Sequence, residues 1–162
     1  MAGQPVGTGG PNMKIAWATQ LDETSTVDKE GVGSIRYQQG KAYKWVLFNN
    51  GSGNVAAVAG NVAYYFEDDG YALGIVTSDL SDSVNIGAGV FQSAPADGEY
   101  CWLQVRGSAT LTTSLTAGSD GNALTAAGST DGTLDVSAAV TDHICAIAED
   151  ASAKLIICMF PL

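Results

Sequence analysis

Apolar and polar positions alternate along much of the chain, and this period-two pattern predicts short β-strands. The clearest example is the stretch YCWLQVRGSATL at residues 100–111. One side of the alternation carries Cys101, Leu103 and Val105, which predict a strand face that points into a β-core.

The other side of the same stretch carries Tyr100, Trp102 and Arg106, although a strand face that meets water does not need such side chains to fold. Tyr, Trp and Arg are the residues most enriched at protein–protein hot spots. We therefore expect these three side chains to lie at an interface with another subunit or with another protein. The alternative is that Trp102 packs in the core beneath a loop.

Further segments with apolar, strand-like patterns are separated by Gly, Asn, Asp and Pro turn signals, which recur roughly every 8 to 14 residues. The predicted strands are residues 13–19, 35–48 with a break at Gly40, 55–66, 71–79, 84–94, 123–127, 133–137, 143–148 and 154–162. The last two are expected to form a hairpin at the heart of the core. No long segment has helical periodicity, so any helix should be a turn or two, with VSAAVTD at 136–142 as the best candidate.

The first 13 residues differ from the rest because they are rich in Gly and Pro, which predicts a flexible or extended arm. The remaining residues, 14–162, are expected to form one domain, since 46% of the chain is hydrophobic and can build a core. The predicted fold class is therefore all-β: a small β-barrel or β-sandwich with an N-terminal arm and at most one or two short helices.

The charge of the chain restricts its partners. A net charge of −10 repels nucleic acid and anionic membrane surfaces, so neither is an expected partner. No apolar run approaches the roughly 18 residues that a membrane span requires, and the N-terminus lacks the apolar region of a signal peptide. Only 15% of the residues are charged, which is typical of subunits whose surface is partly covered by other chains.

Few residues suggest catalytic chemistry. The single histidine, His143, is expected to be structural or exposed, because no G-x-S-x-G nucleophile elbow accompanies it. The three cysteines are widely spaced in apolar runs and predict buried thiols rather than a zinc site. The acidic run at residues 67–69 predicts a solvated turn. We therefore expect no enzyme activity, no cofactor and no metal.

Two regions resemble small structural proteins encoded beside the major capsid genes of tailed bacteriophages. The first matches at Gly40, Tyr43, Trp45, Val46, Asn50, Gly51, Ala59 and Gly60. The second has the pattern G-x-Y-x-W-x-Q-x-x-G and matches at Gly98, Tyr100, Trp102, Gln104 and Gly107, then at Gly128, Asp131, Gly132, Glu149, Asp150 and Ala151. The resemblance covers residues 35–162, and the preceding segment MKIAWATQLDETSTVDKE has no counterpart in it.

The resemblance implies a capsid decoration (cement) protein, which binds the outer surface of the phage head and stabilises the joints between capsomers. It implies the major capsid protein as partner, a homo-oligomer that is commonly a trimer, and a location on the virion. The residues of the arm expected to grip the shell are Gly3, Pro5, Val6 and Pro11. Two other functions stay open: another head or tail structural protein, such as a head-fibre base or tail tube, or a carbohydrate-binding β-sandwich that uses Trp17, Trp45 and Trp102.

Overall fold

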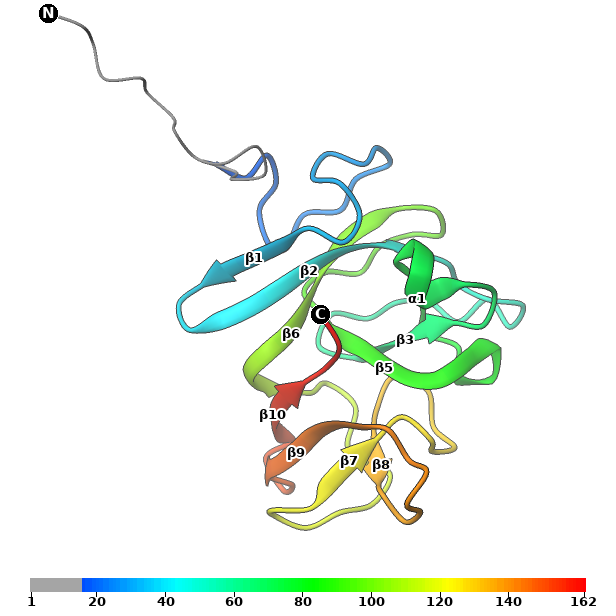
Figure 1. Ribbon diagram of the computed structural model, residues 1–162, viewed down its shortest axis with the longest axis vertical. Helices are drawn as coiled ribbons and strands as arrows, with labels where there is room; N and C mark the ends of the chain where they lie inside the picture. Colours follow the sequence, from blue (N-terminus) through cyan, green and yellow to red (C-terminus); the bar gives the residue numbers. More distant parts are fainter. Residues whose placement is uncertain (1–15) are drawn as a thin grey trace, which may run out of the picture.

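The structure is a computed structural model that describes residues 16–162, so the predicted arm with Gly3, Pro5, Val6 and Pro11 lies outside the described residues. Ten strands are joined in one hydrogen-bonded sheet, shown in Figure 1. The strands are β1 (Ile35–Gln38), β2 (Lys41–Phe48), β3 (Val62–Phe66), β4 (Ile75–Thr77), β5 (Ser83–Phe91), β6 (Tyr100–Thr110), β7 (Ala123–Thr125), β8 (Asp135–Val136), β9 (Ile144–Asp150) and β10 (Leu155–Met159). The helical elements of the described part are α1 (Gly70–Leu73) and the 3-10 turn η1 (Leu80–Asp82).

Five of these strands close into a ring. β2 pairs with β4 in parallel, β4 pairs with β3, β3 with β5, β5 with β6, and β6 returns to β2, all of them antiparallel after the first pair. A closed ring leaves no free strand edges within it. The all-β prediction is confirmed, and the ring makes this part of the molecule a small barrel.

β6 is the longest strand, and it connects the barrel to a second group of strands. Its first residues pair with β2 and β5, while Arg106–Thr110 pair with β10. β10 is followed in the sheet by β9, β7 and β8, which lie below the barrel in Figure 1. The predicted C-terminal hairpin is therefore present as β9 and β10.

One apolar core runs through both groups of strands. It contains the inward side chains of β6 (Cys101, Leu103 and Val105), as the alternation predicts. All three cysteines are buried, free thiols, which confirms that prediction. Loss of water around them raises the pKa of each thiol, to about 12 for Cys145 and Cys158, so they are not activated nucleophiles.

The break predicted at Gly40 is a tight hairpin between β1 and β2. Gln39 and Gly40 both have positive φ, 51° and 75°, which is the backbone of a type I′ turn. This turn follows the right-handed twist of the two strands, and Ile35 to Gln38 pair in register with Lys44 to Lys41.

Four local predictions are wrong. Residues 16–19, the described part of the first predicted strand, are irregular, and so are residues 55–60. Residues 71–79 begin in α1, which Gly74 ends with a left-handed φ of 66° before β4 starts. Residues 137–142 form a turn in place of the expected helix, because the Asp142 carboxylate accepts hydrogen bonds from the backbone N–H groups of Ala138 and Ala139.

In the part of the chain that the structure covers, no helix has both the length and the apolar character that a membrane crossing requires.

Candidate functional site

A segment of the same chain covers the aromatic face that the sequence predicts for β6. Residues 16–32, here called the strap, have no regular secondary structure and lie beside β1 and β2, in blue in Figure 1. Trp17, Leu21 and Val32 of the strap pack against a second apolar cluster, which contains Trp45 and Trp102. The Trp17 ring meets the Trp102 ring edge-on, with 5.2 Å between the ring centroids.

Hydrogen bonds satisfy the polar atoms beneath the strap. The indole N–H of Trp102 donates to the Thr19 hydroxyl over 2.9 Å, and that hydroxyl donates to the Glu30 carboxylate over 2.8 Å. The indole N–H of Trp45 donates to the Asp28 carboxylate over 2.9 Å. Buried indole groups would otherwise carry an unsatisfied donor, so these bonds permit complete burial of both rings.

A cation completes this cluster. The Arg36 guanidinium lies 5.8 Å from the centre of the Trp17 ring and 5.9 Å from that of Trp102. It also donates a 3.0 Å hydrogen bond to the backbone carbonyl of Thr19. Arg36 on β1 therefore holds the strap through both its charge and one hydrogen bond.

This arrangement corrects the interface prediction for Trp102, because its side chain is 0% exposed and has no surface with which to contact another chain. Packing beneath a loop, the alternative interpretation, describes its surroundings. Tyr100 is half-buried and stacks against Trp45, with ring centroids 6.2 Å apart. Trp45 is also 0% exposed, so Trp17, Trp45 and Trp102 do not form an open platform for sugars.

The second half of β6 is different, because Ser108 and Thr110 on its outer side are exposed, with buried Ala109 between them. Arg106, Ser108 and Thr110 lie beside Met159, Ile157 and Leu155 of β10, respectively. Across β10, Ile157 pairs with Ile147 of β9. We call this surface the open face, formed by Arg106, Ser108, Thr110, Ile147, Glu149, Leu155, Ile157 and Met159.

Apolar side chains dominate the middle of the open face. Ile157 is 42% exposed and Met159 is 44% exposed, while Ile156 and Cys158 between them point into the core. The sequence predicted a buried hairpin here because residues 156–158 (IIC) are all apolar. Hydropathy therefore could not show which side chains of β10 point outward.

Two charged side chains border these apolar residues. The Arg106 guanidinium donates to the backbone carbonyls of Val105 and Phe160, and the Glu149 carboxylate accepts a 2.9 Å hydrogen bond from the Ser108 hydroxyl. Neither group takes part in an ion pair within residues 16–162. Arg106 therefore lies on the open face. The structure does not test the expected contact of Arg106 or Tyr100 with another chain, and it stays a prediction.

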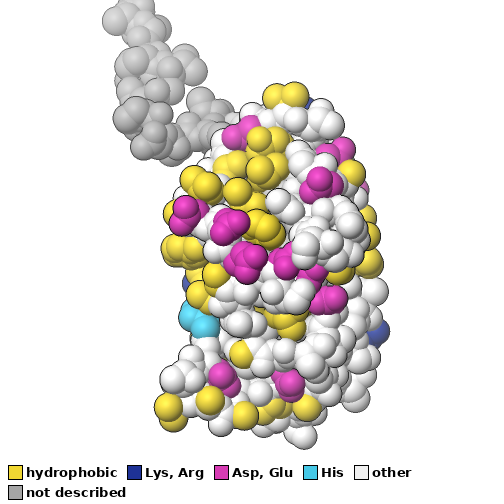
Figure 2. Space-filling model, turned by 90° about the vertical axis from the view of Figure 1, so that its right-hand side faces the viewer, with side chains coloured by type: hydrophobic (Ala, Val, Ile, Leu, Met, Phe, Trp, Pro, Cys, Tyr) yellow, Lys and Arg dark blue, Asp and Glu magenta, His cyan; other side chains and the backbone are white. Residues whose placement is uncertain are grey.

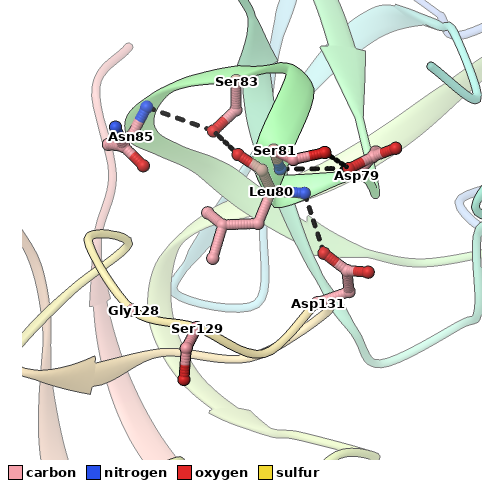
Figure 3. A pocket seen from close by; sticks show the side chains of 8 residues that line it. All are labelled: Asp79, Leu80, Ser81, Ser83, Asn85, Gly128, Ser129 and Asp131. Carbon is pink, nitrogen blue, oxygen red and sulfur yellow. Dashed lines mark hydrogen bonds between the residues drawn. The ribbon is translucent and has the colours of Figure 1, made fainter. Parts of the chain in front are cut away.

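A pocket of about 500 Å³ lies between η1 and the loop at residues 128–131, shown in Figure 3. The carboxylates that line this pocket accept hydrogen bonds that hold the surrounding loops together. Asp79 accepts hydrogen bonds from the backbone N–H and the hydroxyl of Ser81 and from the backbone N–H of Gly53, and Asp131 accepts one from the backbone N–H of Leu80. The Ser81 hydroxyl, together with the backbone donors, lowers the pKa of Asp79.

His143 and Cys145 differ in their exposure. His143 is exposed just before β9, whereas Cys145 is buried with its thiol 3.7 Å from the backbone carbonyl of Leu124. Residues 67–69 form the predicted turn. Within the described residues, no group of three His, Cys, Asp or Glu side chains could hold a metal ion.

No protein-family model, curated protein or solved structure matches this chain.

Proposed function

We propose that this protein is a capsid decoration (cement) protein, a virion structural protein that binds the outer surface of a phage head. The observation that supports the proposal best is the open face. The chain covers one outer side of β6 with its own strap, yet leaves the adjacent side, with exposed Ile157 and Met159, bare. Exposed apolar groups on a sheet whose neighbouring face is fully packed favour a subunit that assembles with other protein chains.

Decoration of a shell suits a contact of this size. A few exposed apolar side chains contribute only a modest free energy, at roughly 25 cal/mol per Å² of apolar surface buried. On a shell, many copies bind a repeated surface, and linkage between copies converts weak contacts into high avidity. A homo-oligomer would provide that linkage.

The charge of the chain supports the same function. Figure 2 shows a face on which Asp and Glu side chains are spread among apolar ones, while Lys and Arg appear only at its rim. With a net charge of −10, decorated particles would repel one another and stay dispersed.

The test is co-sedimentation of the full chain with expanded shells assembled from the major capsid protein of the same genome. We expect saturable binding at a fixed number of copies per shell, with weaker binding to unexpanded shells as the matched control. Electron microscopy of the bound particles should place the protein on the outside of the head. Absence of binding to expanded shells, or a position on the tail, would overturn the proposal.

A further inference from the structure

We propose that the open face is a self-association surface, on which two copies of the chain bind about a two-fold axis that sets Arg106 of each copy against Glu149 of the other. This inference concerns the isolated protein, and it does not rest on the proposed function. It is argued from the apolar centre of the face, its unpaired charges, and the acidity of the rest of the chain.

The apolar centre supplies the driving force. Leu155, Ile157 and Met159 follow one another along the outer side of β10, and Ile147 lies beside Ile157 on β9. Hydrogen bonds to β6 and β9 hold β10 on both edges, so these side chains are presented on a fixed backbone. Contact with a second copy would remove them from water without a rearrangement of the sheet.

The charges define how two copies would meet. Arg106 lies beside Met159, whereas the Glu149 carboxylate is bonded to Ser108, which lies beside Ile157. The two positions on β6 are therefore offset by two residues, roughly 7 Å along the strand. A two-fold axis that lies in the plane of the interface, midway between these two positions and perpendicular to the line that joins them, exchanges them. Each Arg106 then lies opposite the Glu149 of the other copy. Such an interface is self-complementary, as closed two-fold contacts require.

The charge balance selects a second copy as the occupant. Two chains with a net charge of −10 repel each other over most of their surface. On the open face each copy carries one cation, Arg106, and one carboxylate, Glu149, and neither forms an ion pair in the described chain. In the dimer these groups form two attractive pairs, which reduce the repulsion between the copies. A basic partner would gain more from the acidic surface of Figure 2 than from this balanced face.

The experiment is sedimentation velocity of the full chain over a range of concentrations, without any shell. We expect a reversible monomer–dimer equilibrium. Arg106→Glu and Glu149→Arg should each weaken the dimer about tenfold or more, because each places like charges opposite each other twice. The double variant, Arg106→Glu with Glu149→Arg, should restore the dimer to within a few-fold.

A second pair of variants separates the interface from folding. Ile157→Asn should weaken the dimer, whereas Tyr37→Asn should leave it unchanged, since Tyr37 is 73% exposed but lies on β1, outside the open face. Circular dichroism and urea unfolding should show that both variants are folded. A strict monomer at every concentration, a trimer, or a double charge variant that stays monomeric would overturn the proposal.

This outcome is separable from that of shell binding. A chain that dimerises but does not bind shells would contradict the decoration function and leave the self-association surface supported. A monomer that binds shells would support the decoration function and contradict the self-association surface.

Discussion

The two halves of β6 have the same alternation of inward and outward residues but different surroundings. Trp102, in the first half, is completely buried by the strap, whereas Ser108, in the second half, is exposed on the open face. Residues that point inward, such as Leu103 and Ala109, belong to the same core in both halves. The comparison shows that the role of the outward side of a strand depends on the segment that packs over it. The alternation of residues within the strand does not identify that segment.

The polar chemistry of the two halves differs in the same way. Over Trp102, two hydrogen bonds connect the sheet to Thr19 of the strap, one from the Trp102 indole and one from Arg36, and Glu30 binds the Thr19 hydroxyl within the strap. On the open face, the Glu149 carboxylate of β9 accepts a hydrogen bond from Ser108 of β6, across β10, which lies between the two strands. The first set of bonds stabilises the fold of the chain, and the second leaves charge available to another chain.

The largest expected effect is on the covered half. Trp102→Ala removes a fully buried indole from between Trp17 and Trp45, and it should lower the free energy of unfolding by about 3–5 kcal/mol. Ile157→Ala on the bare half should lower it by less than about 1 kcal/mol, because Ile157 is already 42% exposed in the folded state. Urea unfolding followed by tryptophan fluorescence and circular dichroism measures both values. Equal losses in the two variants would contradict the distinction between the two halves.

A smaller effect should follow from the strap alone. Thr19→Val keeps the shape of the side chain but removes the acceptor of the Trp102 indole N–H and one donor to Glu30. Because this leaves a buried donor unsatisfied, we expect a loss of about 1–3 kcal/mol in the free energy of unfolding. The matched control is Thr110→Val on the open face, where water satisfies the polar groups and the change should be within about 0.5 kcal/mol. A loss in the control as large as that in the strap variant would show that the strap hydrogen bonds contribute little.

The smallest effect concerns Lys44, whose side chain lies on the inner side of β2, whereas that of the next residue, Trp45, lies on the outer side. Lys44 is buried, and its ammonium donates a 3.0 Å hydrogen bond to the Tyr65 hydroxyl and lies near the rings of Tyr65 and Tyr71. No carboxylate within residues 16–162 forms an ion pair with it. Burial therefore lowers the pKa of Lys44 below its ordinary value of 10.5.

A lowered pKa means that the unfolded chain holds this proton at pH values at which the folded chain has lost it. The contribution of Lys44 to stability should therefore rise with pH between its lowered pKa and 10.5. A fall opposes this rise, because burial raises the pKa of the three thiols above their ordinary value of 9.0 and the pKa of Tyr64 and Tyr65 above 10.0, so the unfolded chain loses those protons first. The wild type should therefore lose less stability than Lys44→Met as the pH rises through this range, as urea unfolding can measure. An equal pH dependence in the two proteins would show that Lys44 does not supply the rising contribution.

Local features of the fold were accessible from the sequence where one residue decides the backbone. Gly40 marks the β1–β2 turn because left-handed φ angles favour glycine, and the alternation in residues 100–111 correctly placed Cys101 and Leu103 in the core. Residues 55–60 have a similar apolar composition, yet they bond in turns, as in the hydrogen bond from the Asn61 N–H to the carbonyl of Val58. Of residues 55–60 only Ala57 is buried and Val58 is exposed, so their apolar composition indicated neither a strand nor burial correctly.

The sequence by itself determined that this chain is all-β, which strand face of β6 is buried in the core, and that its thiols are buried. These properties depend on period, turn residues and hydrophobicity, which act over a few neighbouring positions. Closure of the β2–β4–β3–β5–β6 ring, coverage of Trp102 by the strap and exposure of Ile157 were decided only by the tertiary structure. Each depends on which distant segment lies against a given face: Thr19 is 83 residues from Trp102, and no local pattern encodes a contact over that separation.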